Sequence, residues 1–229
     1  MSVAIITGAS RGLGLALARA LAERRWELII DARGADALAS VAGELDSRTR
    51  TLPIPGDVAD EEHRRALISA ARSLGRLDLL ANNAAVLGPS PPPRLSGCSL
   101  DALRHVFEIN ALAPLRLLQM ALPLLESSQG RVVNVTSDAA VTPYLGWGLY
   151  GSSKAALEAL SAVAETEHPG LRIYRVDPGD MNTLMEQEGF PDEDVSDRPS
   201  PDAAVPGLLA LVEGDLPSGR YRAQAMDDL

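Results

Sequence analysis

The stretch Thr7-Gly8-Ala9-Ser10-Arg11-Gly12-Leu13-Gly14 follows the apolar run Val3–Ile6 and precedes a helical pattern at Leu15–Arg24. A dinucleotide pyrophosphate binds where the backbone can approach it closely and where a helix N-terminus points at the phosphates. Glycine permits both the tight turn and the close approach. The glycines are separated by three residues and then by one, unlike the common G-x-G-x-x-G fingerprint, so a tight turn without a ligand is the alternative. The stretch predicts a dinucleotide-binding loop between a first strand and a first helix.

Outward from this loop, apolar runs typical of strands alternate with helical patterns along the chain. Several of these runs are almost continuous, as in strands that are covered on both faces. The predicted strands are Val3–Ile6, Trp26–Ile30, Arg50–Ile54, Leu77–Ala81, Arg131–Val135, Leu171–Val176 and Arg220–Ala223. The predicted helices are Leu15–Arg24, Ala35–Leu45, Asp60–Leu74, Ser99–Leu125, Tyr150–Ala164 and Pro201–Val212. The alternation predicts a Rossmann-type α/β fold, a doubly wound parallel sheet of about seven strands with helices on both faces.

Three parts of this pattern are irregular. In the long helix predicted over Ser99–Leu125, Ser99 is a suitable N-cap, and Pro114 and Pro123 should kink or end the helix. The proline-rich segment Gly88–Gly97 is typical of a loop, and Leu184–Ser200 is typical of an acidic surface flap. A linker between domains is the other interpretation of both segments, but neither neighbouring half is a complete sheet. We therefore expect residues 1–229 to form one dinucleotide-binding domain, with residues 184–200 as a substrate-loop flap within it.

The composition limits the class of protein. The 229 residues are 46% hydrophobic and 23% charged, which is neither a disordered nor a membrane composition. The net charge of −10 argues against a nucleic-acid groove, which needs a basic stripe. No apolar run reaches the ~20 residues of a membrane span, and the N-terminal sequence lacks the features of a signal peptide. We therefore expect a cytoplasmic protein with no nucleic-acid or membrane partner.

Cysteine and histidine give little indication of a site. Cys98 is the single cysteine, so no internal disulfide is possible. His63, His105 and His168 lack the spacing of zinc ligands, so we expect no metal. The glycine loop also matches the Gly-x-Ser-x-Gly elbow of hydrolases, with Ser10 as nucleophile. The hydrolase interpretation is disfavoured. In an α/β-hydrolase the oxyanion hole takes an N–H group from a loop after an earlier strand, but here the glycine loop follows the very first strand.

The end of the second predicted strand bears on the choice of dinucleotide. An acid there would bind the ribose hydroxyls of NAD, whereas an arginine would pair with the 2′-phosphate of NADP. Asp31 and Arg33 stand two residues apart, so both types are present. Arg11 supplies a second cation near the same ribose, and a guanidinium fork binds two phosphate oxygens. We therefore predict NADP, with NAD as the alternative.

Five further motifs follow in order, at the ends of predicted strands or on predicted helices. They are Gly56-Asp57-Val58; Asn82-Asn83-Ala84-Ala85; Asn110; Ser137 with Tyr150-Gly151-Ser152-Ser153-Lys154; and Pro178-Gly179-Asp180-Met181-Asn182-Thr183. Together with the glycine loop they resemble the short-chain dehydrogenase/reductase family, from about Val3 to Thr183. The resemblance departs from the family at Ala85, where the usual residue is glycine. Arg33 falls on the family's NADP-type position, and Ala32, one residue after Asp31, stands where the NAD-type acid would be.

The resemblance implies roles for these residues. The implied catalytic residues are Asn110, Ser137, Tyr150 and Lys154. The implied cofactor-binding residues are Gly8, Ser10, Arg11, Gly12, Leu13, Gly14, Arg33, Asp57, Val58, Asn82, Ala84, Tyr150, Lys154, Pro178, Gly179, Met181 and Thr183. By the same resemblance Asp57 and Val58 contact the adenine, the Asn82 segment ties the sheet together and lines the cofactor, and the segment from Pro178 cradles the nicotinamide. By the same resemblance Asn110 bends the long fourth helix, and its backbone carbonyl would hold a water in a proton relay.

The catalytic set suits acid–base chemistry at a carbonyl. Tyr150 and Lys154 are four residues apart, so they share one face of a helix. A phenol has a reference pKa of about 10, and bringing it to about 7 takes roughly 4 kcal/mol of differential stabilisation. A nearby ammonium and an oxidised nicotinamide both favour the phenolate. The tuned phenol would be a general acid for reduction and a general base for oxidation, while Ser137 holds the substrate oxygen and Lys154 also grips the nicotinamide ribose.

The sequence therefore favours an NADP(H)-dependent oxidoreductase acting on a small-molecule carbonyl or alcohol. A non-catalytic NADP-binding regulator on the same fold is the alternative, although a regulator has no need of a tuned phenol. An epimerase or dehydratase ranks third, because such relatives carry a longer C-terminal portion than residues 184–229. By the resemblance we expect a homodimer or homotetramer. The substrate should lie against Ala85–Arg94, Ala139–Leu149 and Leu184–Ser200, where the acidic flap either repels anions or is only a solvated lid.

Overall fold

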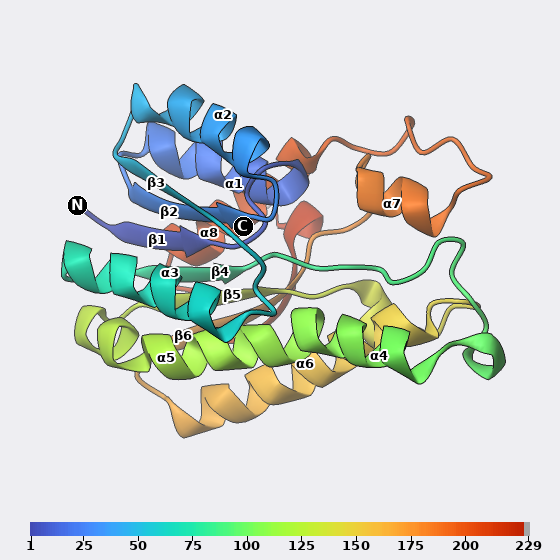
Figure 1. Cartoon of the computed structure of the whole chain (residues 1–229). Coiled ribbons are helices and arrows are strands. Elements are labelled where there is room, and N and C mark those ends of the chain that lie inside the picture. The colour runs from blue at the N-terminus through green and yellow to red at the C-terminus, as the bar shows by residue number, and fades with distance from the viewer. Residues whose placement is uncertain (227–229) are drawn as a thin grey trace.

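Seven parallel strands form one sheet in the computed structural model, which describes residues 1–226 (Figure 1). The strands are β1 (Val3–Ile6), β2 (Glu27–Ala32), β3 (Thr51–Pro55), β4 (Leu79–Asn82), β5 (Arg131–Val135), β6 (Arg172–Asp177) and β7 (Gly219–Arg222). Their order is β3-β2-β1-β4-β5-β6-β7, and every neighbouring pair is parallel. The predicted doubly wound α/β fold is confirmed, and the predicted strand bounds differ from the observed ones by at most two residues.

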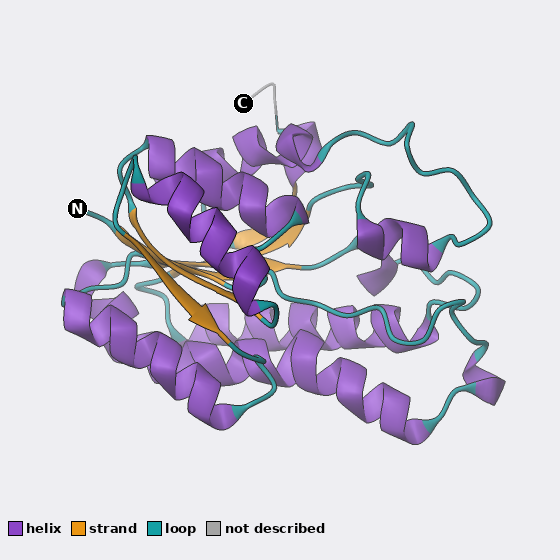
Figure 2. Ribbon diagram, turned by 45° about the horizontal axis from the view of Figure 1, so that its top comes forward, coloured by secondary structure: helices purple, strands orange, loops and turns teal. Residues whose placement is uncertain are grey.

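Helices cover both faces of this sheet (Figure 2). On one face lie α1 (Gly12–Glu23), α2 (Ala35–Asp46) and α8 (Val205–Glu213), and on the other lie α3 (Glu61–Leu74), α5 (Ala113–Ser128) and α6 (Gly148–Glu167). Side chains of β1 alternate between the two cores, Ala4 and Ile6 in the first, Val3 and Ile5 in the second. Successive strand residues point to opposite faces, so an apolar strand such as β1 is buried on both sides.

The order of the strands reverses between β1 and β4. From β1 the chain builds outward through β2 to β3, and from β4 it builds the other way to β7. The segments that follow these two strands therefore meet, and the backbone N–H of Asn83 donates to Thr7 Oγ1 at 2.9 Å. In open α/β sheets ligands bind in the crevice at such a switch point. The glycine loop lies at this point.

The fourth predicted helix is divided into two. Ser99 caps α4 (Leu100–Phe107) as expected, and its Oγ accepts from the N–H of Ala102 at 3.0 Å. A wider π-helical turn over Glu108–Leu112 then separates α4 from α5. The prediction of one helix interrupted at its prolines is wrong. The interruption lies at Asn110, Pro114 stands in the first turn of α5, where its missing N–H costs nothing, and Pro123 lies inside α5 without ending it.

The acidic flap contains a short helix that the sequence pattern did not predict. α7 (Leu184–Gly189) begins after Thr183, whose Oγ1 accepts from the N–H of Glu186 at 3.2 Å. Figure 1 shows α7 beyond the carboxyl ends of the strands. The segment Gly88–Gly97 is irregular as expected, apart from a single 3₁₀ turn at Leu95–Gly97. Within residues 1–226, no helix is both long enough and apolar enough to cross a membrane.

Candidate active site

The glycine loop approaches its surroundings too closely for side chains. Gly8 and Gly12 have φ values of +68° and +56°, in the left-handed region that favours glycine. A Cβ on Gly14 would lie 2.5 Å from Asn83 Nδ2 and from the carbonyl oxygen of Gly8. α1 begins at Gly12, so its unpaired N–H groups open toward the loop. Leu13 contributes only backbone here, because its side chain is buried in the core beneath α1.

Asp31 is part of the support of this loop and not a ribose ligand. It is 1% exposed, and its Oδ1 accepts from the N–H of Gly8 at 2.7 Å. Its Oδ2 lies 2.9 Å from Nε2 of His63 on α3. The His63 ring in turn lies against Gly56, where a Cβ would overlap it. Asp31, which the sequence left as a possible ribose partner of NAD, therefore uses both carboxylate oxygens in contacts with protein groups.

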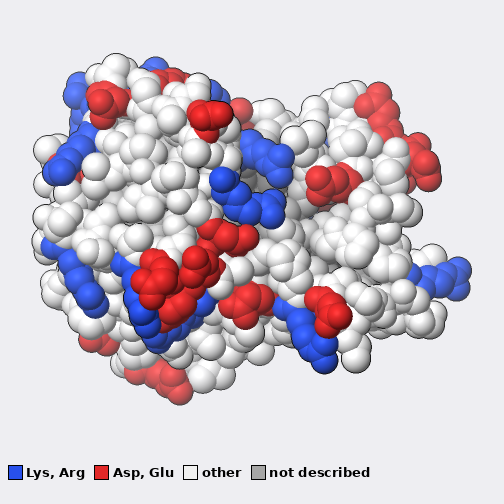
Figure 3. Space-filling view, viewed as in Figure 1, with Lys and Arg blue, Asp and Glu red and all other residues white. Residues whose placement is uncertain are grey.

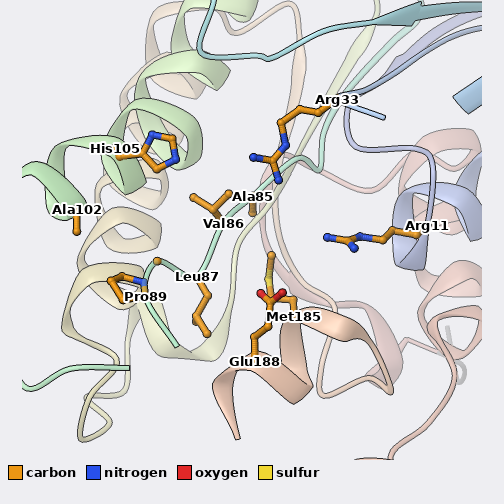
Figure 4. Close-up of a pocket in the computed structure, with 11 residues that line it drawn as sticks. Arg11, Arg33, Ala85, Val86, Leu87, Pro89, Ala102, His105, Met185 and Glu188 are labelled. Carbon is orange, nitrogen blue, oxygen red and sulfur yellow. The ribbon is translucent and has the colours of Figure 1, made fainter. Parts of the chain in front are cut away.

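Two arginines face one cavity instead. Arg11 and Arg33 line a cavity of about 350 Å³ together with Ala85–Pro89 and with residues of α4 and α7 (Figure 4). Both arginines are exposed, and neither forms an ion pair with any residue in 1–226. Figure 3 shows basic side chains gathered around the hollow in the middle of this face. Two unpaired guanidinium groups on one cavity form a site for a phosphate.

The predicted adenine and sheet-tying residues lie nearby. Asp57 Oδ1 accepts from the N–H of Ala59 at 2.9 Å, which fixes the turn after β3. Val58 is buried against the π-helical turn, and its carbonyl accepts from Arg64 Nη1 at 2.6 Å. Asn82 Nδ2 donates to Asn134 Oδ1 at 2.8 Å, tying β4 to β5. The N–H of Ala84 donates to Thr7 Oγ1 at 3.0 Å, so this segment stays beside the glycine loop.

The segment after β6 closes the other side of the cleft. Pro178 is buried, and Gly179 takes a φ of +80° while its N–H donates to Asp177 Oδ1 at 3.0 Å. Thr183 Cγ2 would lie 3.7 Å from a Cβ on Gly12, so the segment runs beside the glycine loop. Met181 packs against the sheet core, and its side chain is only partly exposed. The sequence-predicted cofactor residues are thus brought to one edge of the sheet.

Tyr150 and Lys154 lie one above the other on α6. They are 8% and 2% exposed, and Lys154 Nζ lies 5.5 Å from the centre of the Tyr150 ring. Nζ donates to the carbonyl of Val135, at the end of β5, at 2.7 Å. Asn110 Nδ2 donates to Val86 O at 2.9 Å and to Ser153 Oγ at 3.0 Å, so the π-helical turn is joined to α6.

Burial sets the protonation of this pair. Burial raises the pKa of Tyr150 above its ordinary value, and the charges of Glu186, Asp138 and Asp177 raise it further, against the opposing hydrogen bond of Ser137. Burial lowers the pKa of Lys154 to about 8, because the ammonium has lost its water. The expected acidified phenol depends on a bound oxidised nicotinamide, whose positive charge would favour the phenolate.

Ser137 has an acidic neighbour that the sequence analysis did not single out. Its Oγ donates to Asp138 Oδ1 at 3.1 Å and accepts from the N–H of Ala139 at 3.1 Å. Asp138 Oδ2 accepts from Tyr144 Oη at 2.6 Å. His63 and Asp138 were both missed, because the partners that define them come from other elements or from a loop with no regular pattern.

A glycine loop at the switch point of the sheet, two exposed arginines on one cavity and a buried Tyr–Lys pair are the features expected of a dinucleotide-dependent enzyme. The family model described as short chain dehydrogenase matches residues 2–194. The chain belongs to the short-chain dehydrogenase/reductase family, and it is an oxidoreductase.

Individual relatives agree with this assignment. The chain is 34% identical over 200 residues to sepiapterin reductase of Mus musculus, covering 81% of this chain and 77% of the relative. It is 34% identical over 195 residues to benzil reductase of Saccharomyces cerevisiae, covering 81% and 74%. The solved structure of an alcohol dehydrogenase from Thermococcus sibiricus, complexed with 5-hydroxy-NADP, is similar with a TM-score of 0.88 at 28% identity, covering 97% of this chain and 95% of that one.

Proposed function

We propose that this chain is an NADP(H)-dependent oxidoreductase that interconverts a carbonyl compound and its alcohol, with Tyr150 as the general acid or base. The observation that carries the proposal is the placement of Tyr150 and Lys154, both buried, on one face of α6. Similarity to an alcohol dehydrogenase complexed with an NADP derivative supports the choice of cofactor.

The residues present fit a pyridine dinucleotide phosphate. Gly14 packs directly on Asn83 and Gly8, which keeps the glycine loop compact at the N-terminus of α1, where N–H groups would receive a pyrophosphate. Arg11 and Arg33 would hold the 2′-phosphate, since neither has an acidic partner within residues 1–226. Lys154 Nζ makes one hydrogen bond to described residues, with Val135 O, which leaves two N–H groups for ribose hydroxyls. When bound, NADP(H) supplies or accepts the hydride.

The protein's own groups manage the proton. The raised pKa of Tyr150 keeps the phenol protonated at neutral pH, which is the form that donates to a carbonyl oxygen during reduction. Ser137 holds that oxygen with its hydroxyl, which must turn away from Asp138 to do so. Lys154 stabilises the phenolate left after proton transfer. Asn110 holds Val86 and Ser153, so it fixes the π-helical turn beside the pair.

The experiment incubates the purified chain with NADPH and a panel of aldehydes, ketones and quinones, and measures both cofactor loss and alcohol formation. The expected result is stoichiometric formation of alcohol with at least one class of carbonyl, and weaker use of NADH. Tight NADPH binding without turnover of any member of the panel would contradict the proposal and favour a cofactor-binding regulator. The two outcomes are separated by a binding titration on the same preparation.

A further inference from the structure

Asp138 carries an uncompensated negative charge beside the substrate-binding hydroxyl. Its two oxygens accept from Ser137 Oγ at 3.1 Å and from Tyr144 Oη at 2.6 Å. Within residues 1–226 no lysine, arginine or histidine forms an ion pair with it. The neighbouring Arg220 donates to the carbonyl of Ser137 at 3.2 Å, and its guanidinium pairs with Glu158 at 3.0 Å and lies 3.7 Å from Asp177. Because Ser137 is the residue proposed to hold the substrate oxygen, the carboxylate of Asp138 lies one hydrogen bond beyond that oxygen.

The acidic residues near Asp138 differ in whether an arginine pairs with them. Glu186 is paired with Arg198 at 2.5 Å, and Asp177 lies 3.7 Å from Arg220. Glu188 projects from α7 into the cavity (Figure 4) and has no cationic partner among the described residues. The substrate side therefore holds two free carboxylates, Asp138 and Glu188.

The cations of the cavity do not offset this charge. Arg11 and Arg33 come from the glycine loop and the end of β2 (Figure 4), on the side assigned to the cofactor. A bound 2′-phosphate carries about two negative charges and would neutralise them. His105 of α4 also lines the cavity, and its imidazole is the one further basic group among the cavity-lining residues.

Aromatic and apolar side chains pack around the Tyr150 ring, and two of them, Leu87 and Met185, also line the cavity. The ring of Trp147 meets that of Tyr150 edge-on, with centres 5.6 Å apart, and lies 5.3 Å from Phe190. Leu87 and Met185 pack in the same cluster. Flat aromatic molecules gain from edge or offset contacts with such rings, beyond the area that they bury.

We propose that the substrate of this chain is an aromatic carbonyl compound that is either uncharged or bears an ammonium group, and that Asp138 is the residue that disfavours carboxylate-bearing substrates. The inference rests on the proposed function and adds the substrate class. Unit charges several ångströms apart at a protein surface interact strongly enough to change kcat/KM by roughly tenfold to a hundredfold. Screening by salt lowers this effect, so low ionic strength gives the largest difference.

The test uses three meta-substituted acetophenones that carry an aminomethyl, a hydroxymethyl or a carboxylate group. The kcat/KM of each is measured with NADPH in the parent protein, in Asp138→Asn and in the matched control Asp192→Asn. Asp192 is an exposed acid of the flap at residues 184–200 and does not line the cavity, so its removal changes the net charge by the same amount as Asp138→Asn. Ratios between substrates within one variant are compared, because Asp138→Asn also changes the hydrogen bond to Ser137.

In the parent protein we expect the carboxylate to be at least about tenfold poorer than the hydroxymethyl compound, and the ammonium compound to equal or exceed it. Asp138→Asn should lower the ratio between the hydroxymethyl and the carboxylate compound by about fivefold or more, with Glu188 retaining part of the discrimination, whereas Asp192→Asn keeps the parent ratio. Turnover of the carboxylate as fast as the others, or an unchanged spread in Asp138→Asn, would overturn this inference and leave the oxidoreductase proposal standing. Turnover of none of the three, with NADPH still bound, would overturn the substrate class, while turnover of other carbonyls in the broad panel would preserve the function.

Discussion

Asp31 Oδ2 lies 2.9 Å from His63 Nε2, and the same carboxylate accepts from the N–H of Gly8, so one buried pair joins β2, α3 and the glycine loop. Both side chains are almost fully excluded from water. A buried carboxylate is tolerated only when its oxygens are satisfied, and here a backbone N–H and an imidazole satisfy them. Asp31 thus supports the glycine loop, and recognition of the 2′-phosphate is proposed for Arg11 and Arg33 instead.

Asp31→Ala should weaken binding of NADPH and NADH by similar factors, roughly tenfold to a hundredfold, because the loop loses a charge-assisted hydrogen bond worth about 1.5–3 kcal/mol. Asp31→Asn keeps an acceptor for Gly8 and should retain most of the affinity. Titration of both cofactors by calorimetry checks this, with Asp192→Asn as control. A change in the NADPH-to-NADH ratio would instead mean that Asp31 reads the ribose.

Arg33→Ala should lower the affinity for NADPH by about tenfold to a hundredfold and leave that for NADH within about threefold, since only the 2′-phosphate loses its partner. Arg11→Ala should act in the same direction. The exposed Arg104 pairs with Asp101 and does not line the cavity, so Arg104→Ala is the matched control. Equal losses for both cofactors would show that these arginines do not select the phosphate.

Lys154→Met should abolish activity without lowering the free energy of unfolding at pH 7. Burial lowers the pKa of Lys154 from 10.5 to about 8, so at pH 7 the folded state holds a poorly solvated ammonium at a cost of about 3 kcal/mol. Its hydrogen bond to Val135 O returns about 1.5–3 kcal/mol, because the donor is charged, so the bond at most offsets this cost. The variant should therefore be inactive, yet as stable as the parent or more stable at pH 7.

The lowered pKa of Lys154 also determines how the free energy of unfolding changes with pH. Above pH 8 the folded state releases a proton that the unfolded chain keeps up to about pH 10.5, so the parent gains stability relative to the variant across this window. Denaturant unfolding of both proteins at several pH values measures the difference. A gap that stays constant from pH 7 to pH 10 would show that the lysine carries no burial penalty.

The sheet was predictable because each strand carries its own apolar signal. Val3–Ile6 and Arg131–Val135 were assigned with their observed bounds, since buried parallel strands are apolar on both faces. The π-helical turn at Glu108–Leu112 was not predictable as such. Its residues are compatible with an ordinary helix, and the hydrogen bonds of Asn110 with Val86 and Ser153 stabilise the wider turn.

The parts of the site that depend only on spacing along the chain could be predicted. The i,i+4 spacing of Tyr150 and Lys154 puts them on one helix face, and the glycine loop precedes α1. The partner of Asp31 lies 32 residues away on another helix, so no local pattern connects the two. The extent to which Tyr150 and Lys154 are buried could not be predicted from spacing, because it depends on the packing of α6 against β5.

The most direct measurement is the rate of hydride transfer in Tyr150→Phe, taken at saturating NADPH with a carbonyl that the parent protein reduces. The variant should still bind NADPH, and kcat should fall by about a hundredfold to ten-thousandfold, because it lacks the proton donor for the carbonyl oxygen. Tyr221→Phe, which removes a phenol from β7, should keep the parent rate. A Tyr150→Phe protein that reduces the carbonyl as fast as the parent would contradict the account.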